Sequence, residues 1–205
     1  MTQRGHMRRW GWRLLLGMFG VLAACGNPGG DGCGGIEDLV SCVDVTSVQP
    51  NVNGTITSNV DAFQAEGCDT DPGTVDPEPF TDHAVEMTFS NSTFPTASES
   101  QAVAIRSLTI SYSVSSCPVA ATCPPLADIS QGVTLVIDAE GTASETFPLV
   151  LLQTKAEYRR LGGSEGPPAS YNAHYTFTAQ TENFADTFTV EADVAFTIGN
   201  FDVCQ

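Results

Sequence analysis

Apolar and polar residues alternate along most of the chain with a period of two. The pattern is clearest near the C-terminus, where Tyr171–Ala179 and Phe188–Ile198 carry an apolar residue at every second position. Because successive side chains of a β-strand point to opposite faces, each run predicts a strand with one buried and one solvated face. Further strands are expected at Val43–Val48, Gly54–Val60, Val85–Phe89, Leu108–Val114, Val133–Ile137 and Phe147–Leu151.

The number and composition of these runs predict the fold class. About seven to nine strands, rich in Thr and Val and separated by Gly, Pro, Asn and Asp, are typical of an antiparallel β-sandwich. We therefore expect an all-β domain, immunoglobulin-like in architecture. One segment departs from the pattern: Lys155–Leu161 contains good helix formers and ends at Gly162-Gly163, which predicts a short helix. Because no long helix is predicted, folds built from repeated βαβ units are excluded.

Residues 1–24 have a different composition from the rest of the chain. A basic start is followed by the apolar run Leu14–Ala24. Its helical length of about 16 Å is too short to cross a bilayer core of about 30 Å. A basic start, a short apolar run and a small-residue ending are the features of a secretory signal peptide, so this segment is left out of the predicted fold.

The end of this segment, Leu22-Ala23-Ala24-Cys25, resembles the lipobox of bacterial lipoproteins. The resemblance implies cleavage before Cys25 and transfer of a diacylglycerol to its sulfur, since a thiolate can be alkylated. It also implies a lipid anchor in an envelope membrane. Gly26, where inner-membrane lipoproteins of enteric bacteria have Asp, favours the outer membrane. The alternative is an ordinary cleaved signal that leaves Cys25 as a disulfide partner.

Domain organisation follows from these boundaries. Residues 25–36 are expected to form the lipidated cysteine and a glycine-rich tether, and residues 37–205 a single β-sandwich domain.

The chain has 8 basic and 24 acidic residues and a formal net charge of −16. A surface of that sign repels phosphate, which excludes nucleic acid as a partner. The expected partners are a membrane, through lipid at Cys25, and a protein or other component of the envelope. The acidity also fits a salt-adapted habitat.

Six cysteines remain after Cys25, and an even number in an exported chain predicts up to three disulfides. Cys117 and Cys123 bracket a short loop between two predicted strands, so a local bridge is expected there. The other four cysteines allow three pairings, and the one chosen as a guess is Cys68–Cys204 with Cys33–Cys42. Because the chain has no C-x-x-C motif, zinc, iron–sulfur and haem sites are not indicated.

The longest irregular stretch of the predicted domain contains five carboxylates. They are Asp69, Asp71, Asp76, Glu78 and Asp82. Clustered hard oxygens are the ligands that calcium prefers, so this loop is a candidate calcium site. The spacing does not match an EF-hand, because prolines interrupt it and no flanking helices are predicted. A solvated acidic loop is the alternative.

Other motifs point only weakly to chemistry. Gly162–Gly166 matches G-x-S-x-G by letter, but the hydrolase motif needs a strand before Ser164 and a helix after it, whereas the expected order here is reversed. The two histidines of the mature chain, His83 and His174, are candidates for a base or for a two-histidine metal site with nearby carboxylates. Tyr158 is the candidate exposed ring for stacking against a sugar.

Three of the four basic residues of the mature chain, Lys155, Arg159 and Arg160, fall on the expected helix. They predict either a solvated helix end or an electropositive docking spot for an anionic partner.

No nucleophile–base pair, phosphate-binding loop or metal-ligand spacing emerges from the sequence. The leading functional hypothesis is therefore a lipid-anchored, non-catalytic binding or structural module of the cell envelope. A calcium-binding envelope protein is the second hypothesis and an envelope hydrolase the third. A binding module would present an exposed apolar patch or an unpaired sheet edge, and the long strands Tyr171–Ala179 and Thr187–Ile198 are the first candidates for such an edge.

Overall fold

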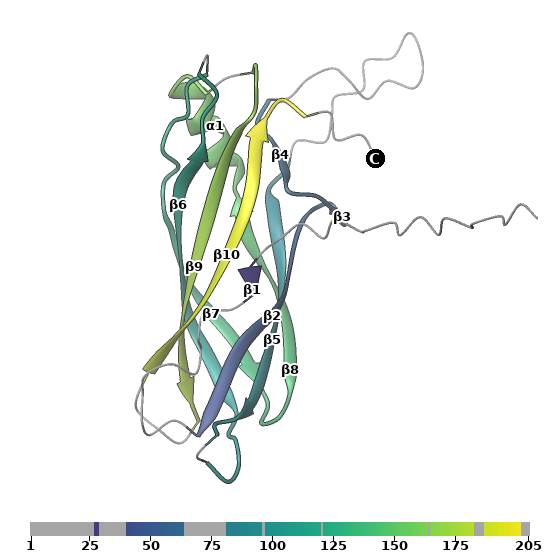
Figure 1. Ribbon diagram of the computed structural model, residues 1–205, viewed down its shortest axis with the longest axis vertical. Helices are drawn as coiled ribbons and strands as arrows, with labels where there is room; N and C mark the ends of the chain where they lie inside the picture. The colour runs from purple at the N-terminus through teal and green to yellow at the C-terminus, as the bar shows by residue number, and fades with distance from the viewer. Residues whose placement is uncertain are drawn as a thin grey trace, which may run out of the picture.

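The chain folds into two β-sheets that pack face to face, with one short helix at one end (Figure 1). The structure is a computed structural model. It describes residues 27–28, 40–63, 81–95, 97–119, 121–163, 165–182 and 187–201. The predicted all-β sandwich is confirmed. Among the described residues, no helix is both long and apolar enough to cross a membrane.

Seven long strands build the sandwich. The larger sheet contains β6 (Val103–Ser116), β7 (Ile129–Ile137), β9 (Ala169–Thr181) and β10 (Thr187–Gly199), and the smaller sheet contains β2 (Ser41–Val52), β5 (His83–Thr93) and β8 (Thr142–Val150). Three short strands lie beside them: β1 (Asn27–Pro28) and β4 (Asn59–Asp61) pair with β10, and β3 (Thr55–Ile56) pairs with β2. The strand orders are β1-β10-β9-β6-β7 and β3-β2-β5-β8.

The period-two pattern translates directly into burial. Along β9, every second residue from Ala169 to Thr181 is buried, and β10 shows the same alternation. The two strands pair in an antiparallel register that places Phe196 opposite Tyr171. β9 is not an edge strand, because it lies between β10 and β6. The outer side of β10 is interrupted by two short strands, since β1 pairs with Ala192–Asp193 and β4 with Thr197–Gly199, and no described strand pairs with the rest of that side.

Aromatic rings from both sheets meet in the middle of the core. Phe177 of β9 lies 5.1 Å from Phe89 of β5 and 5.0 Å from Phe147 of β8, measured between ring centroids. The rings meet edge to face, a favourable geometry for aromatic pairs. Phe177 is fully buried, so this contact joins the larger sheet to the smaller one.

The helix α1 (Leu152–Arg160) connects β8 to β9 and covers one end of the sandwich (Figure 1). It begins three residues before the predicted start at Lys155. It stops at the predicted Gly162, whose φ of +87° is a left-handed conformation that favours glycine. The next residue, Gly163, packs against the Tyr158 ring, where an added Cβ would lie 2.2 Å from a ring carbon.

The segment predicted as a tether contains one described element. Asn27 and Pro28 form β1, which pairs antiparallel with Asp193 and Ala192 in the middle of β10. The other residues of the predicted tether lie outside the described residues.

Candidate functional site

Two strands, β7 and β8, form the open side of the sandwich. β7 ends the larger sheet and β8 ends the smaller one, and within the described ranges no further strand pairs with either. Gln131–Leu135 of β7 and Glu145–Phe147 of β8 line a hollow of about 190 Å³, which we call the β7–β8 cleft. Each strand has one edge with no described partner strand, where backbone N–H and C=O groups can pair with an added strand. The exceptions are the backbone oxygens of Ile137, Pro148 and Leu149, which accept side-chain hydrogen bonds.

The two edge strands differ in how they resist an added strand. β8 contains Glu145 and Pro148, and charge and proline are common protections of a sheet edge. β7 contains neither, since the run from Ile129 to Ile137 has no charged residue and no proline in a chain with 24 acidic residues. Val136 on β7 is also 57% exposed. Of the two edges, β7 is therefore the receptive one.

Tyrosine hydroxyls hold the end of β8 that leads into α1. The Tyr112 hydroxyl donates to the backbone oxygen of Leu149 at 2.7 Å, and the Tyr175 hydroxyl donates to that of Pro148 at 2.7 Å. Burial raises the pKa of both hydroxyls well above the usual range, so both remain protonated donors. Because both tyrosines belong to the larger sheet, these bonds fix β8 across the core and keep this side of the cleft in place.

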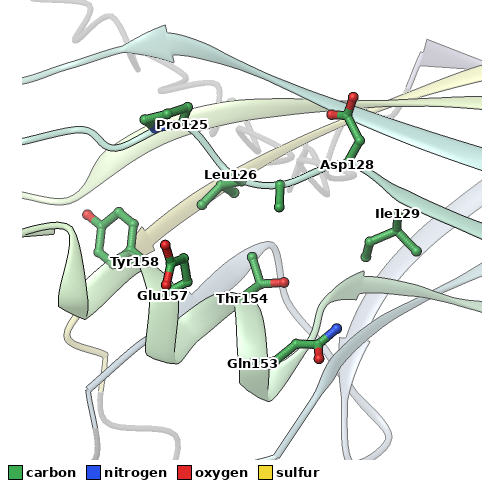
Figure 2. Close-up of a pocket in the computed structure, with 9 residues that line it drawn as sticks. Pro125, Leu126, Asp128, Ile129, Gln153, Thr154, Glu157 and Tyr158 are labelled. Atoms are coloured by element: carbon green, nitrogen blue, oxygen red, sulfur yellow. The ribbon is translucent and has the colours of Figure 1, made fainter.

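A second hollow, of about 240 Å³, lies between α1 and the segment that leads into β7. Figure 2 shows Thr154 and Glu157 of the helix on the side that faces Leu126. Leu126 and Tyr158 are buried and form apolar walls, whereas Asp128 is exposed and Glu157 half-buried. This α1 pocket therefore combines an apolar wall with an acidic mouth. The segment on one side of this pocket continues into β7, and α1 on the other side follows β8 in the chain.

The predicted electropositive spot on the helix is not formed. Lys155 is only 2% exposed. Arg160 donates from Nε to Glu157 Oε2 at 2.7 Å, and this hydrogen bond lowers the pKa of the Glu157 carboxyl. Arg159 is exposed, but one arginine beside an acidic pocket does not make a basic patch. The docking-spot alternative is therefore wrong, because the helix turns its lysine toward the domain, whereas the exposed Arg159 and Arg160 agree with a solvated helix end.

The segment before β5 fixes the position of α1. Lys155 Nζ donates to the backbone oxygen of Thr81 at 2.6 Å. The next residue, Asp82, accepts a hydrogen bond from the backbone nitrogen of Leu152 at 2.6 Å, so its carboxylate caps the start of the helix. Two bonds from adjacent residues thus hold both the first turn and the middle of α1.

His83 is 1% exposed, and its ring contacts the backbone of a neighbouring segment. Its Nε2 lies 3.2 Å from the backbone oxygen of Thr57, which assigns the proton to Nε2. Burial lowers the pKa of this imidazole to about 4, and the charge of Lys155 acts in the same direction. The ring is therefore neutral at neutral pH. Its Nδ1 is buried and has no hydrogen-bond partner among the described residues.

The hypothesised two-histidine metal site does not form. His174 lies on the outer face of the larger sheet, with Nδ1 2.9 Å from Asp193 Oδ1, whereas His83 is buried at the start of β5 in the smaller sheet. Within the residues that the structure describes, no group of three His, Cys, Asp or Glu side chains could hold a metal ion.

The predicted local disulfide is confirmed. Cys117 and Cys123 are bonded, with their sulfurs 2.08 Å apart, and close the loop after β6. Cys42 at the start of β2 is also disulfide-bonded. Cys25, Cys33, Cys68 and Cys204 lie outside the described residues, so the other two predicted pairs remain predictions.

The candidate calcium loop falls almost entirely outside the described residues. Asp69, Asp71, Asp76 and Glu78 belong to that part, and only Asp82 is described. Its Oδ1 caps α1, which gives this carboxylate a structural role.

Two further predictions concerned residues near α1. Tyr158, predicted as an exposed ring, is 1% exposed, and its ring packs edge to face on Phe63 and Tyr171. The sugar-stacking hypothesis for Tyr158 is therefore wrong. Ser164, the serine of the G-x-S-x-G match, lies outside the described residues.

Sequence reasoning missed the β7 edge. The sequence contains one indication of it, because Ile129–Ile137 is the longest uncharged stretch of any edge strand, but the alternating pattern is stronger in the longer C-terminal strands.

Comparison with family models, with curated proteins and with solved structures finds no match to the chain.

Proposed function

We propose that this chain is a lipid-anchored protein of the bacterial cell envelope that binds an extended segment of a partner protein without catalysis. The segment would add as a new strand to β7 and lie along the β7–β8 cleft. Lipid on Cys25 would hold the domain at a membrane, and the Gly26 that follows favours the outer membrane. Residues 1–24 would be removed as the signal peptide.

The observation that carries the binding role is the unprotected edge of β7. An open edge on a soluble sheet invites pairing with another chain, and proteins usually block it with charge, proline or a covering segment. β8 is protected by Glu145 and Pro148, and β10 contains Glu191 and Asp193 and is partly paired with β1 and β4. β7 has no charge and no proline, and its half-buried Val133 and Leu135 border the cleft. Strand addition uses such an edge for affinity and the neighbouring hollow for specificity.

The non-catalytic part of the proposal is supported by the setting of the histidines. His83 is buried and bonded to a backbone carbonyl, and His174 is bonded to Asp193 on a flat outer face. Neither lies in the β7–β8 cleft or the α1 pocket.

Replacing Cys25 by serine tests the anchor. We expect Cys25→Ser to move the protein from the membrane fraction to the aqueous phase of a detergent partition, because serine has no thiolate to receive the lipid. Intact mass of the wild type should show loss of residues 1–24 and an added acyl group. The matched control is the double variant Cys117→Ser/Cys123→Ser, which removes two cysteines and should stay in the membrane fraction. An unmodified Cys25 in membrane-extracted wild type would contradict the anchor.

A photo-crosslinker on β7 tests strand addition. p-Benzoylphenylalanine in place of Thr134, an exposed residue of β7, is expected to crosslink in intact cells to one continuous segment of an envelope protein. The control places the same group at Thr189, an exposed residue of β10 on the outer face of the larger sheet. Peptide mapping by mass spectrometry identifies the attached segment. Equal adducts from both positions, or adducts scattered over unrelated segments, would overturn the proposal.

A further inference from the structure

The charges around β7 indicate the chemistry of its partner. This inference rests on the proposed function, because it asks what kind of segment the β7 edge would take. Three exposed carboxylates lie around the uncharged strand: Asp128 precedes it, Asp138 follows it and Glu145 lies across the cleft. Glu157 lines the α1 pocket, but its charge is paired with that of Arg160.

No basic side chain lines either hollow within the described residues. Among the basic residues of the described chain, Arg160 bonds to Glu157, and Lys155 is buried against Thr81. Arg106 occupies a bulge of β6 and lines a third hollow, of about 340 Å³, together with Val136 and Asp138, so it offsets the charge of Asp138 at that end of β7. The negative charge beside β7 is therefore concentrated at Asp128 and Glu145.

We infer that the occupant of the β7 edge is an extended, basic polypeptide segment. Its centre would be uncharged, so that it pairs with Ser130–Leu135, and a Lys or Arg residue would face Asp128 at one end. A basic residue near the middle would face Glu145.

Charge also argues against the two other kinds of occupant. A second copy of this chain carries the same net charge of −16 and would bring its own Asp128 and Asp138 beside those of the first copy. Like charges placed opposite one another across paired strands are destabilising. An acidic segment meets the same repulsion. Opposite charge, in contrast, speeds the encounter and fixes the register of the added strand.

Two synthetic peptides test the inference on the full-length protein in detergent micelles. Each has about ten residues of alternating valine and threonine, enough to span β7, with lysines at both ends in one peptide and glutamates in the other. Fluorescence anisotropy of the labelled peptides measures their affinity. We expect the basic peptide to bind at least about tenfold more tightly than the acidic one, and this preference to shrink as salt is raised.

Variants place the binding at the cleft. Asp128→Asn/Glu145→Gln is expected to weaken binding of the basic peptide several-fold, with an unchanged Tm as the check on folding. The matched control, Glu191→Gln/Asp193→Asn, removes the same two charges from β10 on the outer face of the larger sheet. An equal loss in both double variants would reduce the effect to general attraction by an acidic protein and overturn the inference.

The possible outcomes separate the two proposals. Equal binding of the basic and acidic peptides would leave strand addition standing and overturn the basic partner. Binding of neither peptide would overturn strand addition at β7 itself. A basic peptide N-methylated on alternate backbone nitrogens should lose its binding, because it cannot complete the main-chain ladder. If it binds as well as the unmodified peptide, the contact is a charged surface rather than an added strand.

Discussion

Phe177→Ala is expected to destabilise the domain by about 3–5 kcal/mol, the range for deleting a buried phenylalanine from a core. The Phe177 ring is fully buried and contacts Phe89 and Phe147 of the opposite sheet. Alanine would remove these contacts and leave a cavity that neither sheet can close without moving. For a domain of this size the loss corresponds to a fall in Tm of roughly 6–20 °C. Urea unfolding followed by circular dichroism measures it.

Two further variants separate cavity formation from other effects. Phe177→Leu keeps most of the buried volume and should lose clearly less stability than alanine. Thr176→Ala changes the neighbouring residue, which faces the outside of the same strand, and should cost less than about 1 kcal/mol. A loss in Phe177→Ala no larger than that in Thr176→Ala would contradict the position of this ring at the junction of the two sheets.

The domain is expected to lose about 2–3 kcal/mol of stability between pH 7 and pH 4.5 through His83 alone. Burial lowers the folded-state pKa of this imidazole to about 4 from an ordinary value of 6.5. At pH values between 4 and 6.5, His83 is protonated in the unfolded chain but neutral in the folded chain. The contribution of neutral His83 is therefore complete above pH 6.5 and is lost as the pH falls toward 4. Urea unfolding at the two pH values gives the difference.

His83→Gln removes the titrating group and keeps a side-chain N–H that can reach the Thr57 carbonyl. This variant should lose less stability on acidification than the wild type, by about 2–3 kcal/mol. Met87→Leu, a change at another buried residue of β5 that does not titrate, should keep the full acid loss of the wild type. If His83→Gln and the wild type lose the same amount, the imidazole is not buried in its neutral form.

Sequence pattern predicted the strands well because burial in a sandwich is decided residue by residue. The alternation in Tyr171–Ala179 appears as the buried face of β9, and the hydroxyl-rich side of the same strand faces solvent. The predicted Leu108–Val114 is the central part of β6. Most observed strands extend beyond their predicted runs, since pairing with a neighbour holds polar residues in extended conformation that have no pattern of their own. The strand predicted at Gly54–Val60 is wrong, because this segment forms the two short strands β3 and β4, which pair with different sheets.

Contacts between distant residues could not be predicted from the local pattern. The helix begins at Leu152 because Asp82, seventy residues earlier, accepts its backbone N–H. Lys155 is buried because the Thr81 carbonyl receives its ammonium, whereas composition alone favours an exposed lysine. The strand order could not be predicted from the local pattern either, and it determines which strand forms the receptive edge. Only the pairing of β7 with β6 on one side shows that no described strand covers its other side.

The short pairing of β1 with β10 decides which way the domain would face. Asn27 lies two residues after Cys25, so at most about 7 Å of chain separates Cys25 from β1. β1 and β7 are at opposite ends of the same sheet, four strand spacings or about 19 Å apart. A lipid on Cys25 would thus bring the β1 side of the domain toward the bilayer and point β7 into the aqueous compartment. The anchor would therefore fix the orientation of the domain as well as its location.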